Sequence, residues 1–349
     1  MSSETATAAR AGSWSEPGAE PVAPGVHRIP LPLPDELAAV NVYALERPDG
    51  LTLIDAGQAL RRARAALEHA LSSLGYAVGD VREFLVTHAH RDHYTLGPQA
   101  RRDHGSRVRV GIREAPALAA LGSPDWPAYA AQLALLRANG AEALADEIGD
   151  DAKAQGIAAD LWEAPDSWIV DEEIIEVGDR RLHAVPTPGH TQGHLVFHDE
   201  HAGLLFAGDH VLPHITPSIG LEPVPGRSPL RDFLGALRRV RRLPDALLLP
   251  AHGPVAPSAH ARVDELLTHH DERLRNTLTA VRAGCTTGFQ VARELPWTRR
   301  RVDFDGLPVF HRMLAVVETS AHLELLVEQN VLTQTFDAGV ITYTEGVAR

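Results

Sequence analysis

Apolar runs separated by turn signals predict a strand-rich first part of the chain. The runs lie at residues 26–31, 39–45, 51–55 and 81–87. Between the third and fourth runs, residues 58–75 carry apolar side chains at helical spacing and end at Gly75, which predicts a helix. The fourth run leads directly into the polar segment 88–93. A strand, a helix and a second strand that ends in a polar loop are typical of α/β folds, whose sites usually lie at such strand ends.

The middle of the chain changes from a helical pattern to a strand pattern. Residues 112–165 are rich in alanine and leucine, interrupted by glycine and proline, and they predict a helical insertion. Short apolar runs then predict strands at residues 174–177, 182–185, 195–198, 203–207 and 245–249. A further helix is predicted over residues 230–242, before the last of these strands.

A separate unit is predicted to begin near residue 258. Three helical patterns and a terminal hairpin pattern occupy residues 259–283, 286–292, 308–329, 331–334 and 340–343. Three helices followed by a hairpin predict a winged-helix domain over residues 258–349. We therefore expect a disordered leader (residues 1–26), a main domain (residues 27–257) that contains the insertion, and this C-terminal unit.

The composition is that of a globular protein, with 44% hydrophobic and 23% charged residues. The formal net charge of −13 disfavours a large nucleic-acid footprint, because such binding relies on basic surface. The sequence predicts neither a transmembrane helix nor a signal peptide, so we expect no membrane partner. The single cysteine, Cys285, cannot form an intramolecular disulfide, and a cytoplasmic location is the simplest expectation.

The segment His88-Ala89-His90-Arg91-Asp92-His93 places three imidazoles and one carboxylate within six residues. These groups suit zinc, iron or manganese, although a polar surface loop with chance histidines is the plain alternative. Three further segments place potential ligands just beyond predicted strands. They are Gly189-His190-Thr191-Gln192-Gly193-His194, Gly208-Asp209 and His252-Gly253. Together these residues supply a ligand set large enough for two metal ions.

This order of motifs resembles the metallo-β-lactamase superfamily over about residues 27–257. The resemblance implies an α+β fold, the αββα sandwich, carrying here the helical insertion and the C-terminal winged helix. It implies two divalent metal ions, with zinc as the first choice and iron or manganese as alternatives. The implied ligands are His88, His90 and His190 for one metal, Asp92, His93 and His252 for the other, and Asp209 as the bridge. Asp55 matches a family position that orients the ligand loop without binding metal.

The chemistry implied is hydrolysis by a metal-bound hydroxide, with Asp92 steering the hydroxide and relaying its proton. The motifs are similar to those of glyoxalase II, and the C-terminal unit resembles that of the β-lactamase-like protein 2 group. A carbonyl ester is the expected substrate, most simply a thioester such as acyl-CoA. A lactone hydrolase and a metal-dependent nuclease or phosphodiesterase are the alternatives, with a metal-binding sensor as a third. Ten arginines and twelve acidic residues in the C-terminal unit weigh against a nuclease.

Three more histidines are candidates for catalysis. His194 follows the third ligand by one turn, where either a catalytic role or a hydrogen bond to a ligand is open. His210 and His214 follow the bridging aspartate, where they would stabilise an oxyanion, protonate a leaving group, or simply pack. Leu212 occupies the position of a tyrosine in related lactone hydrolases, which disfavours that activity. We expect a small-molecule substrate with an acyl or apolar part, bound against aromatic residues of the insertion, and the C-terminal unit could pair two protomers as a homodimer.

Overall fold

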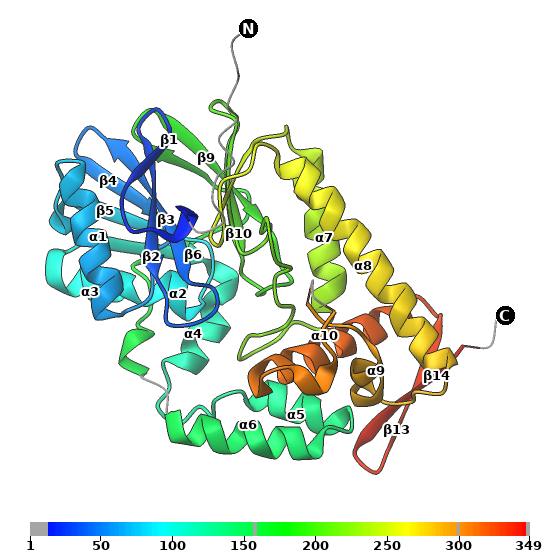
Figure 1. Cartoon of the computed structure of the whole chain (residues 1–349). Coiled ribbons are helices and arrows are strands. Elements are labelled where there is room, and N and C mark those ends of the chain that lie inside the picture. Colours follow the sequence, from blue (N-terminus) through cyan, green and yellow to red (C-terminus); the bar gives the residue numbers. More distant parts are fainter. Residues whose placement is uncertain (1–12, 156–158, 299–300, 347–349) are drawn as a thin grey trace, which may run out of the picture.

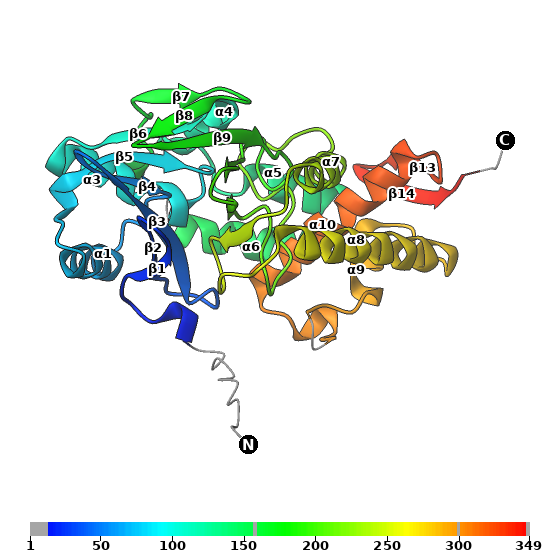
Figure 2. The ribbon, with the colours of Figure 1, turned by 90° about the horizontal axis from the view of Figure 1, so that it is seen from above.

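The computed structural model describes residues 13–155, 159–298 and 301–346. Two sheets form the centre of the main domain, and they lie beside the C-terminal helices (Figures 1 and 2). The first sheet contains, in order, β1 (Glu20–Ala23), β2 (Val26–Pro32), β3 (Ala39–Arg47), β4 (Gly50–Ile54), β5 (Val81–Val86), β6 (Arg107–Gly111) and β7 (Ser167–Ile169). Strands β1 to β4 pair antiparallel, whereas β4 to β7 pair parallel and are joined by helical connections.

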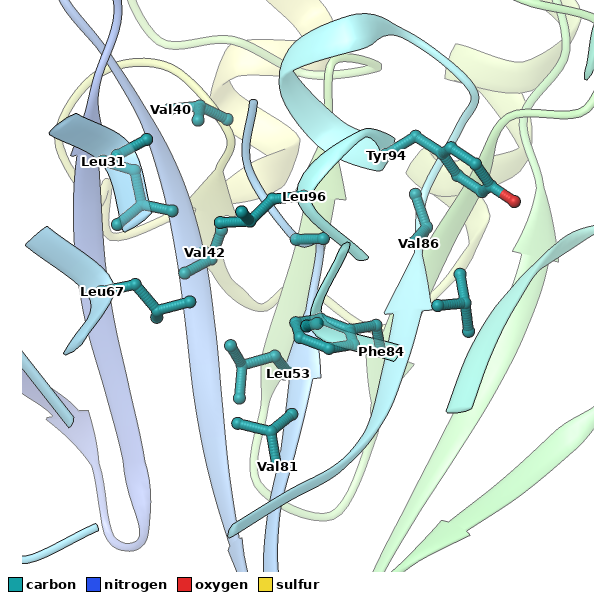
Figure 3. Packing of buried hydrophobic residues seen from close by; sticks show 14 of the residues in the cluster. Leu31, Val40, Val42, Leu53, Leu67, Val81, Phe84, Val86, Tyr94 and Leu96 are labelled. Carbon is teal, nitrogen blue, oxygen red and sulfur yellow. The ribbon is translucent and has the colours of Figure 1, made fainter. Parts of the chain in front are cut away.

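Apolar side chains cover the outer face of the first sheet. Helix α1 (Arg61–Ser73) packs Leu67 onto the sheet, and α3 (Leu96–His104) packs Leu96 there. Figure 3 shows these two leucines in the same buried cluster as Phe84 of β5. Tyr94 also belongs to this cluster, and its hydroxyl donates to the carbonyl of Glu163 at 2.6 Å. The aromatic ring of Trp162 stacks on that of Tyr94, so this part of the insertion packs onto the core.

The second sheet has five strands in the order β12 (Leu247–Pro250), β11 (Leu204–Gly208), β10 (Leu195–Asp199), β9 (Arg180–Pro186) and β8 (Ile174–Val177). Its inner face meets the first sheet in a buried layer, where Tyr43 contacts Phe206 edge to face. Its outer face is covered by α7 (Pro229–Arg242) and α8 (Ala259–Arg282). Helix, sheet, sheet and helix therefore stack as the αββα sandwich that the sequence predicts.

The predicted insertion is helical, with α4 (Ala115–Leu121), α5 (Ala130–Ala138) and α6 (Glu142–Gln155). Leu136 and Leu144 of the insertion share one hydrophobic cluster with Met313 and Val316 of α10 (Val309–Glu328). Because these apolar faces cover each other, the insertion and the C-terminal unit are joined by a common core. Nothing in the sequence indicated this contact between the insertion and the C-terminal unit.

The C-terminal unit contains the elements that the sequence predicts. Helix α9 (Gly288–Glu294) begins with a capping box between Thr287 and Gln290, and it lies between α8 and α10. Strands β13 (Leu332–Asp337) and β14 (Val340–Glu345) form the terminal hairpin. The winged-helix assignment stays a prediction.

Part of the predicted leader forms a strand. Residues 1–12 lie outside the described residues, but Glu20–Ala23 forms β1, which pairs with β2. Arg28 of β2 also donates to the carboxylate of Glu20 and to the carbonyl of Trp14, at 2.7 Å in the latter case. These backbone and guanidinium contacts hold the segment against the sheet. Among the described residues, no helix is long and apolar enough to span a membrane.

Glu324 of α10 gives the C-terminal unit a pH-dependent stability. Burial raises the pKa of Glu324 to about 7, the nearby Glu328 carboxylate adds to the rise, and a hydrogen bond with Ser320 partly offsets it. In the unfolded chain this carboxyl ionises near its ordinary pKa of about 4.3. The free energy of unfolding therefore falls as the pH rises from about 4.5 to 7, because the unfolded state releases the proton first.

Replacing Glu324 with glutamine is expected to remove this loss of stability with rising pH. The variant should gain about 2 kcal/mol in the free energy of unfolding at pH 8 relative to the wild type, and little at pH 4. Denaturant titrations of both proteins at the two pH values measure the effect. An equal change at both pH values would contradict it.

Candidate metal centre

The predicted ligands come from loops that follow four strand ends. His88, His90, Asp92 and His93 follow β5, His190 follows β9, Asp209 follows β11, and His252 follows β12. The structure brings all seven side chains together at one edge of the sandwich, in two adjoining clusters. This position matches the general rule that sites in α/β proteins lie at the carboxyl ends of strands.

The first cluster contains His88, His90, His190 and Asp209, whose candidate ligand atoms all lie within 4.8 Å of one another. His190 Nε2 lies 3.2 Å from His88 Nε2 and 3.0 Å from His90 Nδ1. The Oδ2 atom of Asp209 lies 3.5 Å from His190 Nε2. Three imidazoles and one carboxylate thus converge on a single point.

The second cluster contains Asp92, His93 and His252. Asp92 Oδ2 lies 3.6 Å from His93 Nε2 and 3.2 Å from His252 Nε2. The other carboxylate oxygen of Asp209, Oδ1, lies 3.6 Å and 3.4 Å from the same two nitrogens. Asp209 therefore presents one oxygen to each cluster.

Backbone carbonyls fix the orientation of three imidazoles. His90 Nε2 faces Leu221 O at 2.8 Å, His190 Nδ1 faces Ser218 O at 2.7 Å, and His252 Nδ1 faces Ala39 O at 2.8 Å. A carbonyl can only accept, so each of these nitrogens carries the proton. In the neutral form of each ring, the remaining nitrogen carries a lone pair directed into the centre, as a metal ligand requires.

Asp55 orients a fourth imidazole. It directly follows β4 and adopts a left-handed backbone conformation with φ of 62°. Its Oδ2 lies 2.9 Å from His93 Nδ1, while Oδ1 accepts from the backbone N–H of Thr87 at 2.8 Å. The Thr87 hydroxyl lies 3.0 Å from His88 Nδ1, so one carboxylate and one hydroxyl support two ligand side chains.

Several buried atoms of the two clusters lack hydrogen-bond partners within the described part of the chain, and this arrangement fits a bound metal ion. His93 Nε2, His252 Nε2 and Asp209 Oδ1 are buried atoms without a hydrogen-bond partner among the described residues. In the first cluster, the unprotonated Nδ1 of His90 and Nε2 of His190 lie 3.0 Å apart with no proton to share. Facing lone pairs repel, and buried acceptors without partners are costly, unless a cation lies between them. The set of imidazoles and carboxylates suits a divalent ion such as zinc.

The pKa values of the cluster follow from burial and neighbouring charge. Burial and the neighbouring His190 lower the pKa of His90 to about 3, so His90 is neutral at physiological pH. Burial also opposes protonation of His93, but Asp92, Asp209 and Asp55 outweigh it and raise its pKa to about 10. Burial raises the pKa of Asp92, yet the adjacent His93 and His252 outweigh it and hold the pKa below its usual range. A bound cation would replace the proton on His93.

The three other predicted histidines lie in different surroundings. The Nε2 atom of the buried His194 accepts from the backbone N–H of Asp209 at 3.1 Å, and its Nδ1 lies 2.8 Å from the Thr187 hydroxyl. His210 is buried with its ring edge to face against Phe233 of α7, and it belongs to neither cluster. His214 is exposed near Gly253. Leu212, which occupies the position of a tyrosine in related lactone hydrolases, is apolar and buried.

Gly208, directly before Asp209, is required by this packing. Its φ is 50°, and a Cβ atom at this position would lie 2.7 Å from His194 Nε2 and 2.8 Å from Thr87 Oγ1. Such close contacts exclude any side chain. The glycine lets the chain turn from β11 so that the side chain of Asp209 enters the centre.

Several residues around the centre were missed by sequence reasoning. Gln132 of α5 donates to the carbonyls of Gly220 and Glu222, at 3.1 Å and 2.8 Å, in the loop whose Leu221 carbonyl faces His90. Two buried carboxyl groups, Glu114 and Glu222, flank the loop that carries His190. No local signal marks these residues, because their partners lie 30 to 90 positions away in the sequence.

Fold and site together define a metallo-hydrolase, and the comparison with known proteins agrees. Residues 36–252 match the Metallo-beta-lactamase superfamily, and the chain belongs to this superfamily. The probable metallo-hydrolase YqjP of Bacillus subtilis is 24% identical over 326 residues, covering 90% of this chain and 96% of that protein. The crystal structure of a metallo-beta-lactamase family protein from Thermus thermophilus is 29% identical, with a TM-score of 0.77, covering 93% of this chain and all of that one.

A shorter match covers only part of the fold. The atrochrysone carboxyl ACP thioesterase of Aspergillus fumigatus is 30% identical over 113 residues, which are 32% of this chain and 33% of that protein.

Proposed function

We propose that the two clusters hold two divalent metal ions, with zinc as the first candidate and iron or manganese as alternatives. The observation that carries this proposal is the placement of Asp209, whose Oδ2 faces His190 while Oδ1 faces His93 and His252. When bound, such ions supply Lewis acidity and activate water for hydrolysis near neutral pH. The buried, unpartnered atoms of both clusters support this assignment.

We propose that Asp92 orients the attacking water in this hydrolysis and relays its proton. Its side chain is 19% exposed, compared with 0% to 11% for His93, Asp209, His190 and His252. Within the second cluster, solvent therefore reaches Asp92 most readily. A carboxylate with a lowered pKa at this position orients water and passes its proton outward. His194 acts through the backbone of Asp209 as a positioning residue, and the exposed His214 lies near Gly253, next to the proposed ligand His252.

The proposed substrate is a carbonyl ester, most simply a thioester. The partial similarity to a fungal ACP thioesterase supports this choice. The half-buried side chains of Leu221, Tyr129 and Phe310 join one hydrophobic cluster, while the Leu221 carbonyl faces His90. The side chain of Leu221 thus begins an apolar surface beside the centre. Such a surface suits an acyl chain. The acidic C-terminal unit and the buried Leu212 weigh against nuclease and lactonase activity.

The test combines metal content with a substrate panel. Purified protein is expected to hold about two equivalents of divalent metal and to hydrolyse acyl-CoA thioesters faster than a homoserine lactone, bis-nitrophenyl phosphate or RNA. Removing the metal with a chelator should abolish turnover, and adding zinc back should restore it. The variant His88→Ala should hold less metal and lose turnover. Turnover of RNA or the phosphodiester alone would overturn the thioester assignment.

A further inference from the structure

A buried carboxyl group outside both metal clusters contacts the loops that supply them. Glu114 ends the short 3₁₀ helix Ile112–Glu114, which follows β6, and only 1% of the residue is exposed. A carboxylate in such surroundings is costly, and burial raises the pKa of Glu114 to about 7. A residue of this kind usually has a specific set of partners.

The partners of Glu114 belong to two different ligand loops. Its Oε1 accepts from the Thr191 hydroxyl at 2.5 Å, and Thr191 directly follows the ligand His190. The same carboxylate also lies near the backbone N–H groups of Ala89 and Gly193, while its Oε2 has no hydrogen-bond partner among the described residues. Ala89 lies between the ligands His88 and His90. One side chain therefore spans the two loops that provide all three imidazoles of the first cluster.

Glycines bring these loops to contact distance. A Cβ atom on Gly193 would lie 2.3 Å from Glu114 N and 2.5 Å from Glu114 Cγ. A Cβ atom on Gly111, at the end of β6, would lie 2.4 Å from Gly193 O. The end of β6 and the loop that carries His190 thus meet backbone to backbone, which leaves Glu114 little freedom to move.

A second buried carboxyl group holds the opposite side of the same loop. The backbone N–H of Gln192 donates to Glu222 Oε2 at 3.1 Å, and the Gln192 side chain donates to Val224 O at 2.5 Å. Thr191 is therefore held by Glu114 while Gln192 is held by Glu222. Glu114 alone of this pair also reaches the loop that carries His88 and His90.

We propose that Glu114 is a positioning residue for the first metal: it joins the loop of His88 and His90 to the loop of His190 and sets the separation of their ligand nitrogens. Neither cluster includes Glu114 itself, so it acts through its neighbours and not as a ligand. This inference rests on the proposed function, because it assumes that the first cluster binds metal.

The experiment measures metal affinity in Glu114→Ala, Glu114→Gln and Thr191→Val. Chelator competition should show an affinity for one of the two metals that is about 10- to 100-fold lower in Glu114→Ala, as is typical when a residue that supports ligands is lost. The visible absorption spectrum of the cobalt-substituted protein should change in the same variant. Glu114→Gln keeps an oxygen acceptor for Thr191 and should recover much of the affinity. Thr191→Val should show a smaller loss than Glu114→Ala.

Glu324→Gln is the matched control, because Glu324 is another carboxyl group with a pKa raised to about 7 by burial, and it lies on α10. This variant should keep the wild-type affinity and cobalt spectrum. Unchanged metal affinity in both Glu114→Ala and Thr191→Val, with only a lower melting temperature, would overturn the inference and leave the proposed function intact. A wild-type protein that binds no divalent metal would instead overturn the proposed function, and this inference with it.

Discussion

Replacing Asp209 with alanine is expected to lower hydrolytic activity by about a thousandfold or more, well beyond the 10- to 100-fold loss typical of a residue that only supports a ligand. Its two oxygens face different clusters, at 3.5 Å from His190 on one side and 3.4 Å from His252 on the other. The variant loses a ligand from both sites at once. It also loses the negative charge that offsets the repulsion between two neighbouring divalent ions. Metal analysis of the purified variant should show less than one equivalent.

Asp199→Ala provides the matched control for this prediction. Asp199 is also a buried aspartate at the end of a strand, where it pairs with Arg180 at 2.8 Å and accepts from the backbone N–H of Ala202. Breaking this pair should lower the free energy of unfolding while leaving metal content and the rate per folded molecule unchanged. Full metal occupancy in Asp209→Ala would contradict the bridging role.

Replacing Asp55 with asparagine is expected to weaken binding of the second metal by about 10- to 100-fold. The carboxylate faces His93 Nδ1 at 2.9 Å and favours the ring orientation that directs Nε2 into the centre. Asparagine tolerates the left-handed conformation of this position, so the backbone should be preserved. Activity should fall in parallel with occupancy of the second site and recover when the metal concentration is raised.

The control for Asp55→Asn is Glu172→Gln. Glu172 is another acidic residue with a left-handed backbone, with φ of 63°, and its carboxylate lies 2.6 Å from His183 Nε2 at the surface. Its replacement should leave both metals in place. If Asp55→Asn retained wild-type affinity for both metals, the carboxylate of Asp55 would have no role in positioning His93.

Local patterns in the sequence predicted most of the helices and strands, whereas the sandwich and the ligand set were implied by the resemblance of the motifs to a known superfamily. Strand and helix patterns are local, because they follow from the spacing of apolar residues over a few turns. Each candidate ligand lies just beyond a predicted strand, and the resemblance that these motifs carry implied that His88, His190, Asp209 and His252 share one centre. The same patterns could not extend β1 into the predicted leader, because Glu20–Ala23 is short and its pairing with β2 depends on tertiary contacts such as that of Arg28.

The surroundings of the ligands were decided only by the tertiary structure. Whether a histidine binds, supports or merely packs depends on what its second nitrogen meets, and the carbonyls of Ser218 and Ala39 lie far from His190 and His252 in the sequence. His194 and His210 look alike in the sequence, but one accepts from the backbone of Asp209 and the other packs against Phe233. Glu114 is not part of any motif described for this sequence. Its partners become neighbours only when the end of β6 packs against the loop of His190, because hydrogen bonds form between groups that folding brings together and not between positions in a sequence.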